Sequence, residues 1–143
     1  MDYTSTMTLQ NYPLDHIGVA TNNIDASVAE YEKLLGLKVV HREIAPSKEV
    51  ELCFLALGNT RIELIAPCGP EGAIAKFLGT RGPGLHHLCY RVDNIVQELT
   101  RLEALGITLI DKKPRPGAHG SMIAFIHPSA FGGVLTELCE YSK

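Results

Sequence analysis

Several features that would place the chain in a simple class are missing from its 143 residues. There is no basic stripe, and 13 Lys and Arg against 16 Asp and Glu give a formal net charge of -3, which argues against a nucleic-acid partner. The longest apolar runs have only the length of strands, so we expect no membrane span. No basic segment followed by an apolar one opens the chain, so no signal peptide is predicted.

Paired cysteines are also missing. None of Cys53, Cys68, Cys89 and Cys139 forms a C-x-x-C pair, and their spacing argues against a zinc cluster. Three of them lie within apolar, strand-like runs, so we expect reduced, buried thiols. Reduced thiols predict an intracellular protein, located in the cytoplasm, or in the mitochondrial matrix if the source is eukaryotic.

The most informative feature that is present is an internal repeat. Hydrophobic residues make up 45% and charged residues 20% of the chain, as in a globular domain. A strand-like run with His16 in third place resembles a later run with His87 in third place. Each run leads through Asn-Ile into an amphipathic segment that stops at a glycine, Gly36 or Gly106. The apolar stripes expected on these two helices are Val28, Tyr31, Leu34 and Leu35 in the first, and Ile95, Leu99, Leu102 and Leu105 in the second.

Three strands are expected after each helix, which makes the predicted fold α+β with two tandem βαβββ modules. The expected strands are 38–41, 50–57 and 60–65 in the first half, with a tight turn at Gly58-Asn59, and 108–110, 121–126 and 133–138 in the second half. We predict a loose N-terminal arm at 1–12 and a single domain at 13–143. Within this domain, module one spans 13–67 and module two spans 84–143. A Gly- and Pro-rich linker at 68–83 joins the modules and is expected to form one or two helical turns at 73–78.

The repeat places a histidine on the first strand and a glutamate on the last strand of each half. Glu63 follows His16 at the same place in the pattern at which Glu137 follows His87. A carboxylate between apolar neighbours is costly to bury without a cation. Pseudo-twofold packing would bring the two histidines and two glutamates together, and this donor set suits a divalent ion such as Co, Zn, Mn or Ni.

Taken singly, each of these residues has a simpler interpretation. A lone strand histidine is usually a hydrogen-bonded core or rim residue, and a lone strand glutamate usually faces solvent. The recurrence of the pair at equivalent positions favours metal ligation. His86 competes with His87, but the repeat aligns His87 with His16, so we predict that His86 faces the other side of the strand.

These motifs resemble the vicinal oxygen chelate superfamily, which includes glyoxalase I, and within it the methylmalonyl-CoA epimerase family. The resemblance covers the chain from about Leu14 to its end and is carried by five stretches, which are 14–20, 58–64, 84–88, 115–120 and 132–140, together with His127-Pro128. It implies a curved half-barrel sheet around the metal site and a homodimer. It also implies epimerisation of methylmalonyl-CoA, or a similar 2-substituted malonyl thioester, through a metal-stabilised enolate.

The chain departs from that family at one position. The epimerases usually carry a glutamate just before the third strand as an acid/base group, and Ser47 stands there in this sequence. Either Glu49 or Lys48 substitutes for it, or the ligand Glu137 moves the proton, as the ligand carboxylate does in glyoxalase I. The simpler interpretation of Lys48-Glu49 is a solvated turn. The predicted catalytic residues are therefore Glu137 and Glu49.

Other sites and functions stay open at the level of sequence. His119, in a Gly-rich loop, could touch the substrate, and Lys112, Lys113 and Arg115 could meet the phosphates of CoA, although each also suits a solvated surface. The competing functions are a glyoxalase I-type lyase acting on a glutathione hemithioacetal, an extradiol dioxygenase, and a metal-free binding protein of the same fold. A fourth ligand at Glu63 argues against the dioxygenase, and four intact ligand positions argue against the metal-free protein.

Overall fold

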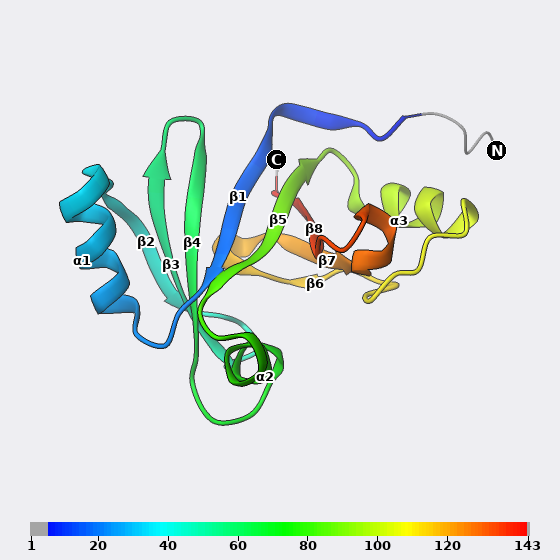
Figure 1. The fold of residues 1–143 in the computed structure, drawn as a ribbon. Coiled ribbons are helices and arrows are strands. Elements are labelled where there is room, and N and C mark those ends of the chain that lie inside the picture. The colour runs from blue at the N-terminus through cyan, green and yellow to red at the C-terminus, as the bar shows by residue number, and fades with distance from the viewer. Residues whose placement is uncertain (1–5, 143) are drawn as a thin grey trace. The chain divides into compact units, whose positions relative to one another are not determined.

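The computed structural model describes residues 6–142. Its helices and strands, in chain order, are β1 (Leu9–Ala20), α1 (Ile24–Leu35), β2 (Val39–Ile44), β3 (Val50–Leu57), β4 (Thr60–Pro67), α2 (Ala73–Arg81), β5 (Gly84–Val92), α3 (Ile95–Ala104), β6 (Arg115–Pro116), η1 (Ala118–Gly120), β7 (Met122–Ile126), η2 (Pro128–Phe131) and β8 (Thr136–Glu140) (Figure 1). Among these described residues no helix is both long and apolar enough to span a membrane.

The chain divides into two compact units. One comprises residues 16–86 and is called here the first-repeat unit. The other comprises the described chain up to Asp15 together with residues from His87 onward, and is called the second-repeat unit. The boundaries between the two units fall inside β1 and β5.

The first-repeat unit contains strands in the order β2-β3-β4-β1. The pairs β2–β3 and β3–β4 are antiparallel, whereas β1 and β4 are parallel, with Gly18 opposite Glu63. The predicted turn at Gly58-Asn59 joins β3 to β4, and Gly58 has a φ of 60°, a conformation that glycine adopts at little steric cost.

The second-repeat unit repeats this pairing with β5, β8 and β7. The strands β5 and β8 are parallel, with Cys89 opposite Glu137, while β7 is antiparallel to β8 and to the short β6. In each unit, then, the strand before the helix pairs in parallel with the last strand of the repeat. The predicted βαβββ repeat is confirmed.

Each repeat has its own helix-covered core. In the first-repeat unit α1 covers apolar residues of β3 and β4, among them Cys53, Leu55 and Leu64. In the second-repeat unit α3 buries Ile95, Leu99 and Leu102 against β5, β7 and β8. The two helices begin in the same way, because Asn23 and Asn94 each accept a hydrogen bond at 3.0 Å from the backbone N–H three residues later.

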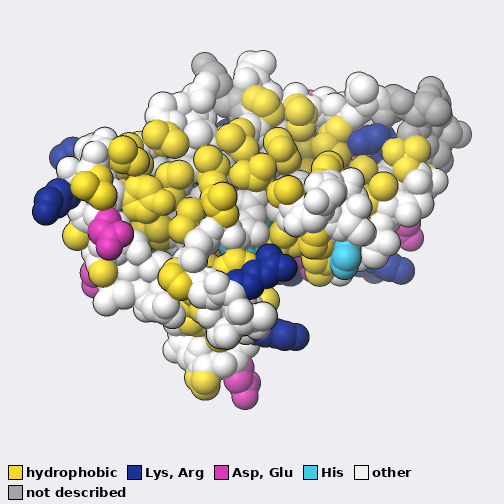
Figure 2. Space-filling view, viewed as in Figure 1, with side chains coloured by type: hydrophobic (Ala, Val, Ile, Leu, Met, Phe, Trp, Pro, Cys, Tyr) yellow, Lys and Arg dark blue, Asp and Glu magenta, His cyan; other side chains and the backbone are white. Residues whose placement is uncertain are grey.

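The predicted apolar stripes on the helices are only partly buried. Val28 and Tyr31 contact the core, but Leu34 and Leu35 are 73% and 65% exposed, and Leu105 at the end of α3 is 48% exposed. Figure 2 shows apolar side chains gathered at the surface over α1 and the neighbouring strands of the first-repeat unit.

Three of the predicted elements differ in extent or place from those of the structure. The predicted arm 1–12 is not loose throughout, since β1 begins at Leu9 and the Thr8 N–H donates to the carboxylate of buried Glu98 at 3.2 Å. The predicted strand 108–110 is reduced to a single bridge between Leu109 and Ile126, and the short strand β6 forms instead at Arg115–Pro116. The predicted helical turns at 73–78 extend to the nine-residue α2.

The cysteines behave as the sequence predicts for strand residues. Cys53, Cys89 and Cys139 are buried within β3, β5 and β8, and Cys68 is exposed after β4. All four are free thiols. Burial, helped by a hydrogen bond with Cys139, raises the pKa of the Cys89 thiol well above its usual value, so this group stays protonated.

Candidate metal centre

The first histidine–glutamate pair lies inside the first-repeat unit. His16 stands on β1 two residues before Gly18, which faces Glu63 on β4, so the register places the two side chains on one face of the sheet. His16 Nε2 lies 3.5 Å from Glu63 Oε1, and both side chains are buried. The opposite face of β4, which carries Ile62 and Leu64, packs in the core under α1.

The second pair has the same construction inside the second-repeat unit. His87 stands on β5 two residues before Cys89, which faces Glu137 on β8. His87 Nε2 lies 3.1 Å from Glu137 Oε1, and both side chains are again buried. The equivalence of His16 with His87 and of Glu63 with Glu137, inferred from the repeat, therefore holds for register, burial and contact within each unit.

A phenylalanine on the adjacent antiparallel strand supports each imidazole. Phe54 is opposite Glu63 and Phe125 is opposite Glu137. The ring of His16 meets Phe54 edge-on, with centroids 5.6 Å apart and an interplanar angle of 80°. For His87 and Phe125 the values are 5.4 Å and 82°. Edge-to-face contact fixes the plane of each imidazole and leaves an apolar wall beside the carboxylate.

The chemistry and spacing of each pair fit a divalent metal ion. Two donors bound at about 2.1 Å to one ion lie about 3.0 Å apart at right angles and about 3.4 Å apart at tetrahedral angles. The nitrogen–oxygen distances of 3.5 Å and 3.1 Å match these separations. A carboxylate buried beside an imidazole in each unit is also the arrangement that a cation stabilises most.

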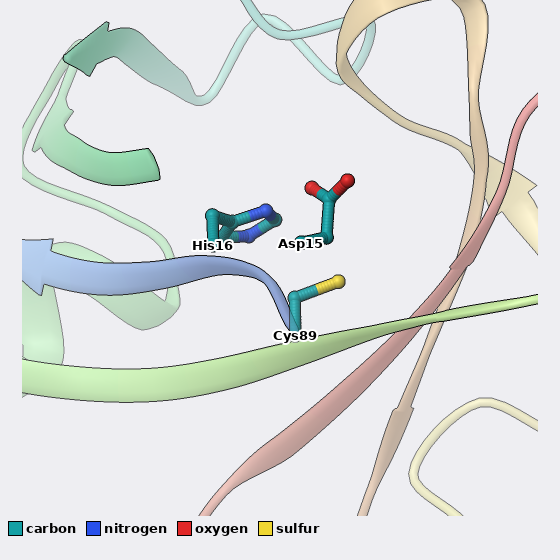
Figure 3. A group of neighbouring side chains, drawn as sticks. All are labelled: Asp15, His16 and Cys89. Carbon is teal, nitrogen blue, oxygen red and sulfur yellow. The ribbon is translucent and has the colours of Figure 1, made fainter. Parts of the chain in front are cut away.

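Asp15 and Cys89 form a different cluster in the second-repeat unit (Figure 3). A carboxylate oxygen of Asp15 and the thiol of Cys89 lie within 4.8 Å. Asp15, however, accepts hydrogen bonds from Arg91 at 2.6 Å and from the Tyr141 hydroxyl at 3.1 Å, and the Arg91 guanidinium stacks over the Tyr141 ring. With its carboxylate matched by Arg91 and its thiol protonated, this cluster is a structural ion pair, not a ligand set.

The predicted base Glu49 lies in the turn before β3 and is exposed. Its N–H donates to Ser47 Oγ at 3.3 Å, and its carboxylate lies against Gly72, which caps the N-terminal end of α2. Ser47 and Lys48 are exposed in the same turn, where Lys48 has a φ of 65°. These contacts favour the solvated-turn interpretation of Lys48-Glu49.

Three residues that we did not predict share the face of the first metal pair. His41 is opposite Phe54 on β3, and Phe54 is in turn opposite Glu63 on β4, so His41 and Glu63 belong to one row across the sheet. Glu43 lies two residues further along β2 and Arg61 two residues before Glu63, both on that face. The alternation His-x-Glu in a strand was the available signal for His41 and Glu43.

The remaining candidates lie elsewhere. His86 packs edge-on against Phe77 of α2, with centroids 4.9 Å apart. His119 is exposed in η1 with a φ of 56°. In the predicted basic cluster Lys112 and Lys113 are exposed, while Arg115 pairs with Asp111 at 3.4 Å and lies 5.7 Å from the Phe125 ring centroid.

Comparison with known proteins places this geometry in a family. The family model described as the glyoxalase/bleomycin resistance protein/dioxygenase superfamily matches residues 15–125. An ethylmalonyl-CoA/methylmalonyl-CoA epimerase of Cereibacter sphaeroides is 38% identical over 128 residues, which cover 87% of this chain and 95% of that protein.

Two solved structures agree with this result. The methylmalonyl-CoA epimerase of Mycobacterium tuberculosis superposes with a TM-score of 0.89 at 36% identity, covering 97% of this chain and 93% of that one. A methylmalonyl-CoA epimerase in complex with methylmalonyl-CoA and NH4+ superposes with a TM-score of 0.87 at 29% identity, covering 96% of both chains. The glyoxalase-like fold predicted from the sequence is confirmed. The chain therefore belongs to the glyoxalase/bleomycin resistance protein/dioxygenase superfamily and, within it, to the methylmalonyl-CoA epimerase family of isomerases.

Proposed function

We propose that the chain catalyses the metal-dependent epimerisation of methylmalonyl-CoA or a similar 2-substituted malonyl thioester. The observation that carries the proposal is the recurrence of a buried histidine–glutamate pair at the same register in both repeats, at 3.5 Å and 3.1 Å. The C. sphaeroides relative, which is 38% identical to this chain, is named an ethylmalonyl-CoA/methylmalonyl-CoA epimerase.

In this proposal His16, Glu63, His87 and Glu137 hold one divalent ion, Co, Zn, Mn or Ni. Two neutral imidazoles and two carboxylates balance its charge, and an octahedral ion would keep two positions for substrate oxygens. When bound, the ion supplies Lewis-acid stabilisation of the negative charge that develops on the thioester oxygen after α-proton removal. Phe54 and Phe125 orient the two imidazole ligands.

The chain's own residues supply binding and orientation. Arg61 lies on the face of Glu63, with its guanidinium 4.2 Å from the centroid of the Phe54 ring. Stacking keeps this cation in place, and a planar guanidinium suits the free carboxylate of a malonyl thioester. The apolar ring of Phe54, 1% exposed, excludes water from the side of the acyl group and so strengthens these charged contacts.

Epimerisation also needs a group that removes the α-proton and one that returns it on the other face. We keep Glu137 as a candidate for one of these steps, since its carboxylate is buried beside His87. Glu49, exposed in the turn before β3 and lying against Gly72, is the candidate that the sequence gives for the other step.

We further propose that the chain acts as a homodimer on an acyl-CoA substrate. The exposed apolar side chains of Leu34 and Leu35 on α1 and of Val39 and Val40 on β2 support a covered surface in the first-repeat unit. Four free thiols support a reducing location, in the cytoplasm or the mitochondrial matrix.

The test is α-proton exchange of methylmalonyl-CoA in deuterated water, followed by NMR. We expect metal-loaded protein to exchange the proton and interconvert the epimers, and protein stripped with EDTA to do neither until metal is restored. Absence of exchange with metal demonstrably bound would refute this substrate class, and glutathione hemithioacetals would be tested next. Exchange that EDTA leaves unaffected would refute the metal dependence.

A further inference from the structure

A carboxylate–imidazole pair lies on the first-repeat unit outside the four proposed ligands. His41 Nε2 is 2.9 Å from Glu43 Oε1, and both side chains lie on the same face of β2. They are 31% and 26% exposed, so the pair is partly shielded and still reaches solvent. A contact of this length between a half-buried imidazole and a carboxylate fixes the ring and determines which nitrogen carries the proton.

The sheet register points this pair toward the first metal pair. His41, Phe54, Glu63 and Gly18 stand opposite one another on the consecutive strands β2, β3, β4 and β1. Strands lie about 4.8 Å apart, so the backbones of His41 and Glu63 are about 10 Å apart across the row. His41 and Glu63 therefore flank Phe54 on one face of the sheet.

Phe54 forms the floor between the two groups. Its ring is in edge contact with His16 at 5.6 Å and in tilted contact with His41 at 6.1 Å, while the Arg61 guanidinium covers it at 4.2 Å. The same face therefore presents a proposed ligand, a cation and a histidine–carboxylate pair around one aromatic ring. This is the arrangement expected where an anionic acyl group is held for proton transfer.

We propose that His41 is an acid/base residue of this site and that Glu43 is its positioning residue, an assignment that rests on the proposed function. With Nε2–H donating to Glu43, the ring lone pair is on Nδ1. In the forward step the α-C–H bond breaks, its electron pair stays on the acyl group, and the proton passes to His41. Glu43 stabilises the resulting imidazolium, and a proton from the opposite face completes the inversion.

This assignment supplies the second proton carrier that Ser47 cannot provide. The other carboxylate near β2 is differently placed, because Glu51 accepts a hydrogen bond from Arg42 at 2.6 Å, and Arg42 also binds Asp25 of α1. Those contacts put Glu51 on the helix-covered face of the sheet. Glu51→Gln is therefore a matched control, a carboxylate-to-amide change one strand away from Glu43 and on the other face.

The experiment measures deuterium uptake separately from each epimer of methylmalonyl-CoA, together with interconversion of the two diastereomeric thioesters. The proteins are the wild type, His41→Gln, Glu43→Gln and Glu51→Gln, each with its metal content measured. For His41→Gln we expect interconversion to fall by about 100-fold or more. Exchange should be lost for one epimer only, because the opposite base still serves the other. Glu43→Gln should show the same asymmetry with a smaller loss, and Glu51→Gln should match the wild type.

Addition of imidazole to His41→Ala gives a second readout, since a small base that enters the vacated space should restore exchange of the affected epimer. Unchanged interconversion in His41→Gln would overturn the assignment, as would equal loss of exchange for both epimers at normal metal content. Wild-type protein that exchanges neither epimer would instead refute the proposed function, and this assignment with it.

Discussion

At the scale of single residues, the site depends on buried side chains that are held in place by contacts with their neighbours. Asp15 is buried and bound by Arg91 and Tyr141, so it orders the segment of β1 that leads directly into His16. Its partner Arg91 has a raised pKa, to which the hydrogen bond with Asp15 contributes against the opposing effect of burial. Asp15 thus has a structural role, whereas the next residue, His16, is a proposed metal ligand.

We predict that Asp15→Asn lowers the free energy of unfolding by about 1.5–3 kcal/mol, the usual value of hydrogen bonds to a charged group. Denaturant unfolding of the two proteins at neutral pH measures the difference. Tyr141→Phe, which removes only the hydroxyl contact at 3.1 Å, is the milder comparison. A loss below about 0.5 kcal/mol in Asp15→Asn would mean that the ion pair adds little beyond surface charge.

The sequence predicts some of the candidate site residues and misses others. His16, Glu63, His87 and Glu137 were identifiable because a repeat marks equivalent positions without any knowledge of structure. His41, Glu43 and Arg61 have no counterpart that the repeat could mark, and only the register of β2, β3 and β4 shows that they share a face with Glu63. Glu49 was chosen by its place in the sequence, whereas its side chain lies against Gly72.

At the scale of elements, the two repeats show which local signals determine structure. Asn23 and Asn94 begin α1 and α3 with the same side-chain cap, and Gly36 and Gly106 follow the two helices with φ values of 69° and 81°. Such signals involve only neighbouring residues, so the sequence predicts them well. The predicted strand 108–110 keeps only the bridge between Leu109 and Ile126, because the edge of β7 at Met122 and Ile123 pairs with β6 instead.

We predict that Asn94→Ala destabilises the protein by about 1 kcal/mol, because α3 loses its cap while its buried face still has to pack. Thermal unfolding measures the effect, with Gln97→Ala, an exposed position in the first turn of the same helix, as the control. If Asn94→Ala and Gln97→Ala melt together, the cap seen at 3.0 Å does not stabilise α3.

At the scale of the whole molecule, the central claim is that a duplicated βαβββ unit supplies two histidine–glutamate pairs to one metal ion. The repeat predicted both pairs, and the structure describes each of them within its own unit. The proposal goes one step further and has both pairs bind a single ion. The number of metal ions bound per chain tests this step directly.

The most direct measurement is therefore the metal content and affinity of purified protein reloaded with a single divalent metal, compared among the wild type, Glu63→Ala, His87→Ala and the control Glu49→Gln. We expect one ion per chain in the wild type and in the control, and at least about tenfold weaker binding in both ligand variants, since each removes one of four donors. Two ions per chain would mean that each pair acts alone, and unchanged binding in Glu63→Ala or His87→Ala would contradict the site.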